Sequence, residues 1–282
     1  MAFEILDTLS IPGDPAKPND DAFAHCETAA VVMDGATGLG DPLLPGESDA
    51  AWIARFGANR LMAHLKDGAT AQAALAAAFS DAERSFKGLR KREPAETYEI
   101  PFASMMLAME SAGGFDALWF GDCAALVKRG AEPAFIVGEA FDRKTNERSY
   151  AAKIADRYGI APAAGINRPE VLPALRKARN RINTVAGSWL FGPDARAAEH
   201  AQMKRVAAPS GTFVLAGSDG FFALVSEYAH YDPEGLMAAA QAKGLAALGV
   251  ELRAIEETDP DGHKYPRFKK SDDATAVLFR VT

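Results

Sequence analysis

Short apolar runs that stop abruptly at glycine and aspartate recur along the chain. The run at residues 213–216 is followed by Gly-Ser-Asp-Gly at 217–220, and the run at 29–33 is followed by Asp34 and Gly35. Continuous apolar runs bounded by turn residues are typical of strands that are buried on both faces. Both stretches are therefore predicted to be core strands, and each delivers an aspartate at its carboxyl end.

Two longer segments have the spacing of amphipathic helices. In residues 47–65 and 71–89, apolar side chains recur every three or four positions, which predicts two helices that pack on a sheet. Further strands are predicted at 3–10, 23–28 (separate from 29–33 or continuous with it), 102–109, 116–120, 124–128, 135–137 and 274–281, and further helices at 221–225 and 232–257. Successive strands followed by helices indicate the α+β class rather than a regular βαβ repeat.

Residues 143–205 differ in character from the rest of the chain. They are polar and alanine-rich, and four prolines interrupt the helical pattern. We interpret this segment as a helical insertion or lid over one face of a single domain that spans residues 1–282. Four basic residues crowd one part of it, namely Arg176, Lys177, Arg179 and Arg181. A solvated helix face is the simplest interpretation, and a basic surface that meets a phosphorylated partner is the alternative.

Composition narrows the possible functions. The chain has 282 residues, 48% of them hydrophobic, which is enough for a large core, and its formal net charge of −7 argues against a general nucleic-acid binder. The two cysteines lack metal-site spacing, and the first residues do not combine a basic region with a long apolar run, as a secretion signal would. No segment reaches membrane-spanning length. We therefore expect a cytoplasmic protein without nucleic-acid or membrane partners.

Acidic residues lie at the ends of the predicted core strands. They are Asp20 with Asp21, Asp34, Asp219, and Asp272 with Asp273. Taken singly, an aspartate next to glycine is a common turn residue. Taken together without histidine or cysteine, these carboxylates are the ligands that magnesium and manganese prefer. Two such ions about 3.5–4 Å apart share a bridging hydroxide and clamp a phosphoryl group during in-line attack.

The acidic residues stand in a recognisable order of short motifs. These are Asn19-Asp20-Asp21-Ala22-Phe23, Val32-Met33-Asp34-Gly35, Gly121-Asp122-Cys123, Ser218-Asp219-Gly220-Phe221 and Asp272-Asp273-Ala274-Thr275. In this order and on these predicted elements, the set resembles that of the metal-dependent type 2C protein phosphatases, over nearly the whole chain. The resemblance implies a four-layer α-β-β-α sandwich of two antiparallel sheets flanked by helices, with a binuclear magnesium or manganese centre at one edge.

The resemblance also implies a role for each ligand. By this resemblance, Asp34 bridges the two metals and Gly35 contributes its carbonyl, while Asp219 and Asp272 complete the shell of one metal. Asp20, where the family usually has Glu, holds the other metal directly or through water. Asp122 contacts a third, weaker metal. The implied activity is hydrolysis of phosphoserine and phosphothreonine in proteins by the metal-bridging hydroxide, in which Asp34 and Asp219 act through the metals.

Three alanines depart from the family pattern. Ala16 stands where the family often has an arginine that holds the substrate phosphate, and the adjacent Lys17 is the candidate replacement. Ala36 stands where some members have a histidine that protonates the leaving group, so slower turnover of alkyl phosphates is expected. Ala223 stands where a second acid for the third metal would lie, so that third site is expected to be weak or absent.

Other functions compete with the protein phosphatase. The three alanines leave open a non-catalytic, phosphatase-like regulatory or binding module, and small phosphorylated metabolites are an alternative substrate class. Residues 216–220 also differ by one substitution from the G-x-S-x-G nucleophile motif, with Ser218 as the attacking residue. That reading lacks a convincing acid and histidine downstream and leaves Asp34 and Asp272 unexplained.

Overall fold

Two antiparallel five-stranded sheets lie face to face at the centre of the structure, a computed structural model that describes residues 2–46, 48–139, 151–153, 155–166 and 168–282. The first sheet consists, in spatial order, of β1 (Phe3–Ile11), β10 (Ala274–Val281), β9 (Phe213–Gly217), β6 (Ala124–Lys128) and β7 (Phe135–Gly138). The second consists of β2 (Asp21–Cys26), β3 (Ala29–Gly35), β4 (Ala103–Ser111), β5 (Gly114–Phe120) and β8 (Gln202–Ala207).

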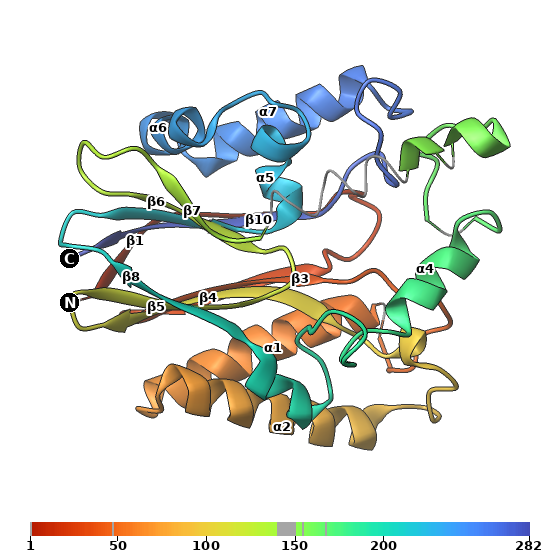
Figure 1. Cartoon of the computed structure of the whole chain (residues 1–282), viewed down its shortest axis with the longest axis horizontal. Helices are drawn as coiled ribbons and strands as arrows, with labels where there is room; N and C mark the ends of the chain where they lie inside the picture. Colours follow the sequence, from red (N-terminus) through yellow and green to blue (C-terminus); the bar gives the residue numbers. More distant parts are fainter. Residues whose placement is uncertain (1, 47, 140–150, 154, 167) are drawn as a thin grey trace.

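Helices cover the outer faces of both sheets (Figure 1). The second sheet is covered by α1 (Asp49–Lys66) and α2 (Ala71–Leu89), and the first by α5 (Asp219–Ser226), α6 (Pro233–Lys243) and α7 (Leu245–Thr258). The four-layer α-β-β-α sandwich expected from the sequence is thereby confirmed. No helix within the described ranges combines the length and the apolar character that crossing a bilayer requires.

The apolar run of β3 is explained by burial on both of its faces. Val31 and Met33 pack toward α1 and α2, whereas Ala30 and Val32 lie in the layer between the two sheets, and all four side chains are fully buried. Burial of a large apolar side chain contributes roughly 1.5–3 kcal/mol to folding. The strand is thus anchored on both sides up to the position where Asp34 emerges.

The long helix expected at residues 232–257 is instead two helices, α6 and α7. They are separated by Gly244, whose φ of +81° lies in the left-handed region that favours glycine. The carboxylate of Asp7 accepts a hydrogen bond from the amide of Leu245 at 2.7 Å and so satisfies the first turn of α7. The apolar pattern is continuous across the break because both helices pack on the same sheet.

The expected insertion at 143–205 ends earlier than its sequence indicates. Residues 143–150 lie outside the described residues, and the rest contains α4 (Leu172–Arg179) and the 3₁₀ helix η2 (Ala195–His200). Its last residues belong to β8, which pairs antiparallel with β5 at the edge of the second sheet. This strand was not recognised because only Val206 of its six residues is buried, which leaves no apolar alternation. Figure 1 shows α4 at the end of the sandwich opposite the chain termini.

Candidate metal centre

Strand register brings the acidic residues to one end of the sandwich. In the second sheet, Asp34 of β3 pairs with Asp21 of β2 on one side and with Ser104 of β4 on the other. In the first sheet, Gly217 at the end of β9 pairs with Ala276 of β10 and with Ala124 of β6. The positions two residues before β6 and before β10 therefore come close to the position two residues after β9. These positions are occupied by Asp122, Asp272 and Asp219.

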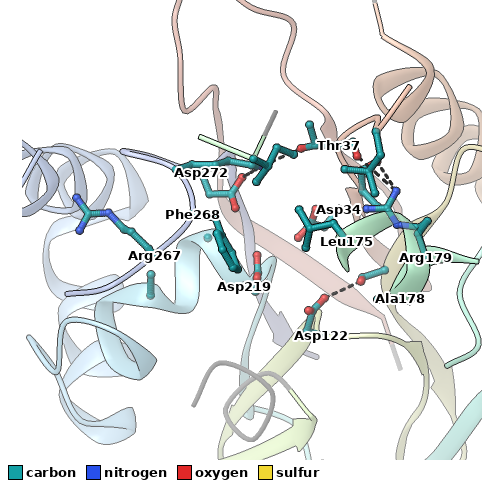
Figure 2. Close-up of a pocket in the computed structure, with 18 of the residues that line it drawn as sticks. Asp34, Thr37, Asp122, Leu175, Ala178, Arg179, Asp219, Arg267, Phe268 and Asp272 are labelled. Carbon is teal, nitrogen blue, oxygen red and sulfur yellow. Dashed lines mark hydrogen bonds and ion pairs between the residues drawn. The ribbon is translucent and has the colours of Figure 1, made fainter. Parts of the chain in front are cut away.

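Three carboxylates form the inner part of this acidic cluster. Oxygen atoms of Asp34, Asp122 and Asp219 all lie within 4.8 Å of one another. They line a cavity of about 660 Å³, and Asp272 lines the same cavity. Figure 2 shows the four carboxylates facing a common space. The hydroxyl of Ser104 donates a hydrogen bond of 2.6 Å to Asp122, which holds that side chain in the cluster.

Burial and mutual repulsion make this cluster costly without a cation. Burial raises the pKa of Asp34 well above its ordinary value, and the charges of Asp21, Asp219 and Asp122 raise it further. Burial likewise raises the pKa of Asp20, although the hydroxyl of Ser48 opposes that shift by donating a hydrogen bond to its carboxylate. Closely spaced carboxylates that repel one another are compensated by a divalent cation. The all-oxygen donor set fits magnesium or manganese.

The backbone at Gly35 permits a close approach that no other residue would allow. A Cβ atom at this position would lie 2.5 Å from the carbonyl oxygens of both Ala50 and Asp20. The amide of Gly35 donates to the carbonyl of Asp20 at 3.1 Å. The segment that carries Asp20 is thus held directly against the end of β3, and Gly35 itself lines the cavity that contains Asp34.

The outer acidic residues have other partners in this structure. Asp20 lines two adjoining cavities rather than the one that contains Asp34. Asp272 accepts a hydrogen bond of 2.7 Å from Lys269, which also donates to the hydroxyl of Thr37 at 2.8 Å. The carboxylate of Asp273 accepts hydrogen bonds from the amides of Gly13 at 2.7 Å and of Asp20 at 2.6 Å, and so ties two loops together.

Two residues considered from the sequence lie away from the inner carboxylates. Lys17 is 74% exposed, forms an ion pair of 3.4 Å with Asp14, and lines only the adjoining cavities. The hydroxyl of Ser218 is fully buried and accepts a hydrogen bond of 3.0 Å from the amide of Thr275. Ser218 is therefore a buried residue that binds the first residues of β10, and its hydroxyl is not accessible to a substrate. This excludes the G-x-S-x-G alternative.

Several solved structures match this chain in fold over almost its whole length. No family model and no curated protein matches the sequence. The serine/threonine phosphatase PstP/Ppp of Mycobacterium tuberculosis matches in structure with a TM-score of 0.58 and 16% identity, over 100% of this chain and 99% of that chain. The PPM Ser-Thr phosphatase MsPP of Mycobacterium smegmatis, in complex with cacodylate, has a TM-score of 0.56 and 16% identity, over 99% of both chains. Stp1 of Staphylococcus aureus has a TM-score of 0.55 and 13% identity, over 98% of this chain and 94% of that chain.

The chain has the type 2C phosphatase fold. The resemblance inferred from the ordered motifs is confirmed at this level, because the matches extend over essentially the whole chain. The acidic cluster lies at the end of the type 2C sandwich at which β3 and β9 end and β6 and β10 begin.

Two cations of the cavity were not identified individually from the sequence. Arg179 at the end of α4 lines the cavity, and burial lowers its pKa to about 10 while Asp34 acts in the opposite direction, so it is charged at neutral pH. The nearby Arg176 is instead used in packing, since it donates to the carbonyl of Leu39 at 2.8 Å. Lys269 is another such cation. Burial lowers its pKa, but the charge and hydrogen bond of Asp272 and the charges of Asp34 and Asp273 together raise it above its ordinary value. Sequence spacing alone does not separate Arg179 from its basic neighbours.

Asp21 provides a test of the buried charge in metal-free protein. Its side chain is 3% exposed, and burial raises its pKa well above the ordinary value, with Asp273 and Asp272 contributing in the same direction. Above a pH of about 4 the folded state therefore holds more protons than the unfolded state, so this group lowers the free energy of unfolding as pH rises. In EDTA, we expect the melting temperature of Asp21→Asn to exceed that of wild type by more at pH 8 than at pH 5. An equal difference at both pH values would contradict this assignment.

Proposed function

We propose that this protein is a metal-dependent phosphomonoester hydrolase that removes phosphate from phosphoserine and phosphothreonine in proteins. The convergence of the Asp34, Asp122 and Asp219 carboxylates at the end of a type 2C sandwich is the observation that carries the proposal. The structural neighbours support the substrate class, because several are named serine/threonine phosphatases. A structure of the PstP catalytic domain is described in complex with two manganese ions. Small phosphorylated metabolites are the alternative substrates.

The proposed ligand set uses two magnesium or manganese ions. Asp34 and the carbonyl of Gly35 would be shared by the two ions. Asp219 and Asp272 would hold one ion, and Asp20 would hold the other from the adjoining cavity through water. When bound, such a pair makes hydroxide available at neutral pH and neutralises charge on the phosphoryl oxygens. Lys269 contacts only one oxygen of the Asp272 carboxylate, so the other oxygen would serve the ion while that contact remains.

A third metal has weaker support. Asp122 belongs to the inner carboxylate cluster, but Ser104 already donates to one of its oxygens. Ala223 lines the same cavity and offers no ligand atom. A weak or absent third ion is therefore part of the proposal.

A cytoplasmic location is also part of the proposal, and it rests on the composition of the chain.

The regulatory-module alternative is disfavoured by the ligands that are retained. A decayed centre is expected to lose carboxylates, yet Asp20, Asp34, Asp219 and Asp272 are all present at this end of the fold.

Ala36 affects the choice of substrate rather than the presence of the metals. It lies at the cavity wall without a proton to donate, so the leaving group must depart with little acid assistance.

Phosphate release in the presence and absence of metal tests the proposed function. We expect hydrolysis of p-nitrophenyl phosphate and of a phosphoseryl peptide with Mn²⁺ or Mg²⁺, and complete loss of both activities in excess EDTA. Because general acid catalysis contributes roughly 10²–10⁴-fold, the chemical step should be slower for the seryl ester, whose alkoxide leaving group needs a proton. Activity that is insensitive to EDTA would remove the mechanism, and equal chemical rates for the two esters would show that another acid replaces Ala36.

A further inference from the structure

We propose that Arg179 of α4 binds the phosphoryl group of the substrate from the insertion side of the cavity. The inference deepens the proposed function and rests on it for the identity of the substrate. It assigns to the insertion a direct part in the site. It also supplies the guanidinium that is missing at Ala16.

The position of α4 places Arg179 over the acidic cluster. Leu175, Ala178 and Arg179 line the same cavity as Asp34 and Asp219. Figure 2 shows the guanidinium of Arg179 beside Thr37, on the side of the cavity where Asp34 lies. A phosphate held at the carboxylate cluster would therefore have this cation as a neighbour.

The guanidinium of Arg179 is not committed to a carboxylate. Its Nη1 atom lies 3.5 Å from the carbonyl oxygen of Ala36 and 3.4 Å from that of Thr37, which is longer than an ordinary N–H···O hydrogen bond. Among the described residues, no acidic side chain forms an ion pair with it. Its planar fork of donors is thus available to a ligand that presents two oxygens.

The other cations around the cavity are already engaged. Lys269 contacts Asp272 at 2.7 Å, and Arg267 contacts Asp259 at 2.9 Å. Figure 2 shows the guanidinium of Arg267 directed away from the carboxylates. Lys17 is exposed and lines only the adjoining cavities. Arg179 is therefore the cation that the described part of the cavity offers to an incoming anion.

The chemistry of the cavity favours phosphate at this position. A guanidinium donates two parallel hydrogen bonds to phosphate oxygens, a geometry that an ammonium does not reproduce. Leu175 and Phe268 contribute apolar wall to the same cavity, Leu175 from α4 and Phe268 on the side of Asp219 and Asp272. Such a wall excludes water and strengthens a charge-assisted hydrogen bond. Without Arg179, the phosphoryl oxygens that do not reach the ions would face mainly neutral or acidic groups.

Substitution of Arg179 tests the assignment by phosphate binding as well as by turnover. Arg179→Met preserves much of the apolar stem, and Arg179→Lys preserves the charge without the fork. With Mn²⁺ present, we expect Arg179→Met to raise the Kd for inorganic phosphate, measured by calorimetry, and the KM for p-nitrophenyl phosphate by about 10- to 100-fold. Arg179→Lys should lose less than Arg179→Met. Both variants should still bind Mn²⁺, because Arg179 provides no ligand atom to the proposed metal pair.

The matched control is Lys177→Met, two residues earlier on the same helix. Lys177 is exposed and does not line the cavity, so phosphate binding and KM should be unchanged. Phosphate affinity in Arg179→Met equal to that of wild type would overturn the assignment, as would a wild-type protein that does not bind phosphate. If wild type binds phosphate through Arg179 but does not hydrolyse phosphomonoesters in Mn²⁺ or Mg²⁺, the assignment stands and the proposed function fails.

Discussion

Asp34→Asn is expected to lower metal-dependent phosphate release by about 10³-fold or more without unfolding the protein. The carboxylate of Asp34 lies within 4.8 Å of those of Asp122 and Asp219 and is the proposed bridge between two ions. A metal pair provides several kcal/mol of transition-state stabilisation, and each 1.36 kcal/mol lost corresponds to tenfold in rate. Steady-state hydrolysis of p-nitrophenyl phosphate measures the loss of rate, and Mn²⁺ calorimetry measures the loss of metal binding.

Melting experiments separate this loss of activity from misfolding. In EDTA, Asp34→Asn should melt at a higher temperature than wild type at pH 8, because it removes a buried charge that its acidic neighbours repel. Asp116→Asn is the matched control. Asp116 is also a strand aspartate, but both of its oxygens are bound by Arg205 at 2.7 and 2.8 Å, outside the acidic cavity. Wild-type turnover in Asp34→Asn would contradict the metal centre.

Gly220→Ala is expected to destabilise the protein by roughly 1–3 kcal/mol and to lower activity by about 10²-fold. A Cβ atom at Gly220 would lie 2.0 Å from the carbonyl oxygen of Asp273 and 3.3 Å from the Cβ of Asp272. Relief of this overlap must move the start of α5 away from the loop that precedes β10. That movement would separate Asp219 from Asp272, which the proposed centre requires to act on the same ion. Urea denaturation and steady-state kinetics measure the two effects.

Gly88→Ala is the control for a helical glycine without a close neighbour. Gly88 lies in α2, and a Cβ atom there would meet nothing within 4 Å. Because alanine favours a helix over glycine, we expect a gain in stability of about 0.5–1 kcal/mol and unchanged turnover. If Gly220→Ala behaved like Gly88→Ala, the close approach of α5 to the β10 loop would be wrong.

Much of the secondary structure could be predicted because its signals are local. The apolar run at 29–33 became β3, and the stripes at 47–65 and 71–89 became α1 and α2. These patterns are strong because each element buries a defined face against a large core. The ends of the helices also follow the sequence, since Ser48 accepts from the amide of Ala51 and caps α1.

The failures of prediction occur where the local pattern carries little information. Strand β8 was missed because it is an edge strand whose side chains are nearly all exposed, so its pairing with β5 decides its conformation. The helix at 232–257 was predicted without its break, since a glycine is tolerated inside helical patterns. Only the packing of α7 against β1, with Asp7 at its first turn, shows that Gly244 ends α6.

The sequence by itself determined which acids this protein has and that they stand next to buried strands. Only the tertiary structure decided that Asp34, Asp122 and Asp219 meet, that Asp20 lies in an adjoining cavity, and that Arg179 covers the group. The physical reason is that local patterning specifies where a strand ends. The residues that share that end are specified by hydrogen-bonded register between strands distant in sequence, such as β9 and β10, and by the packing of α4 over them.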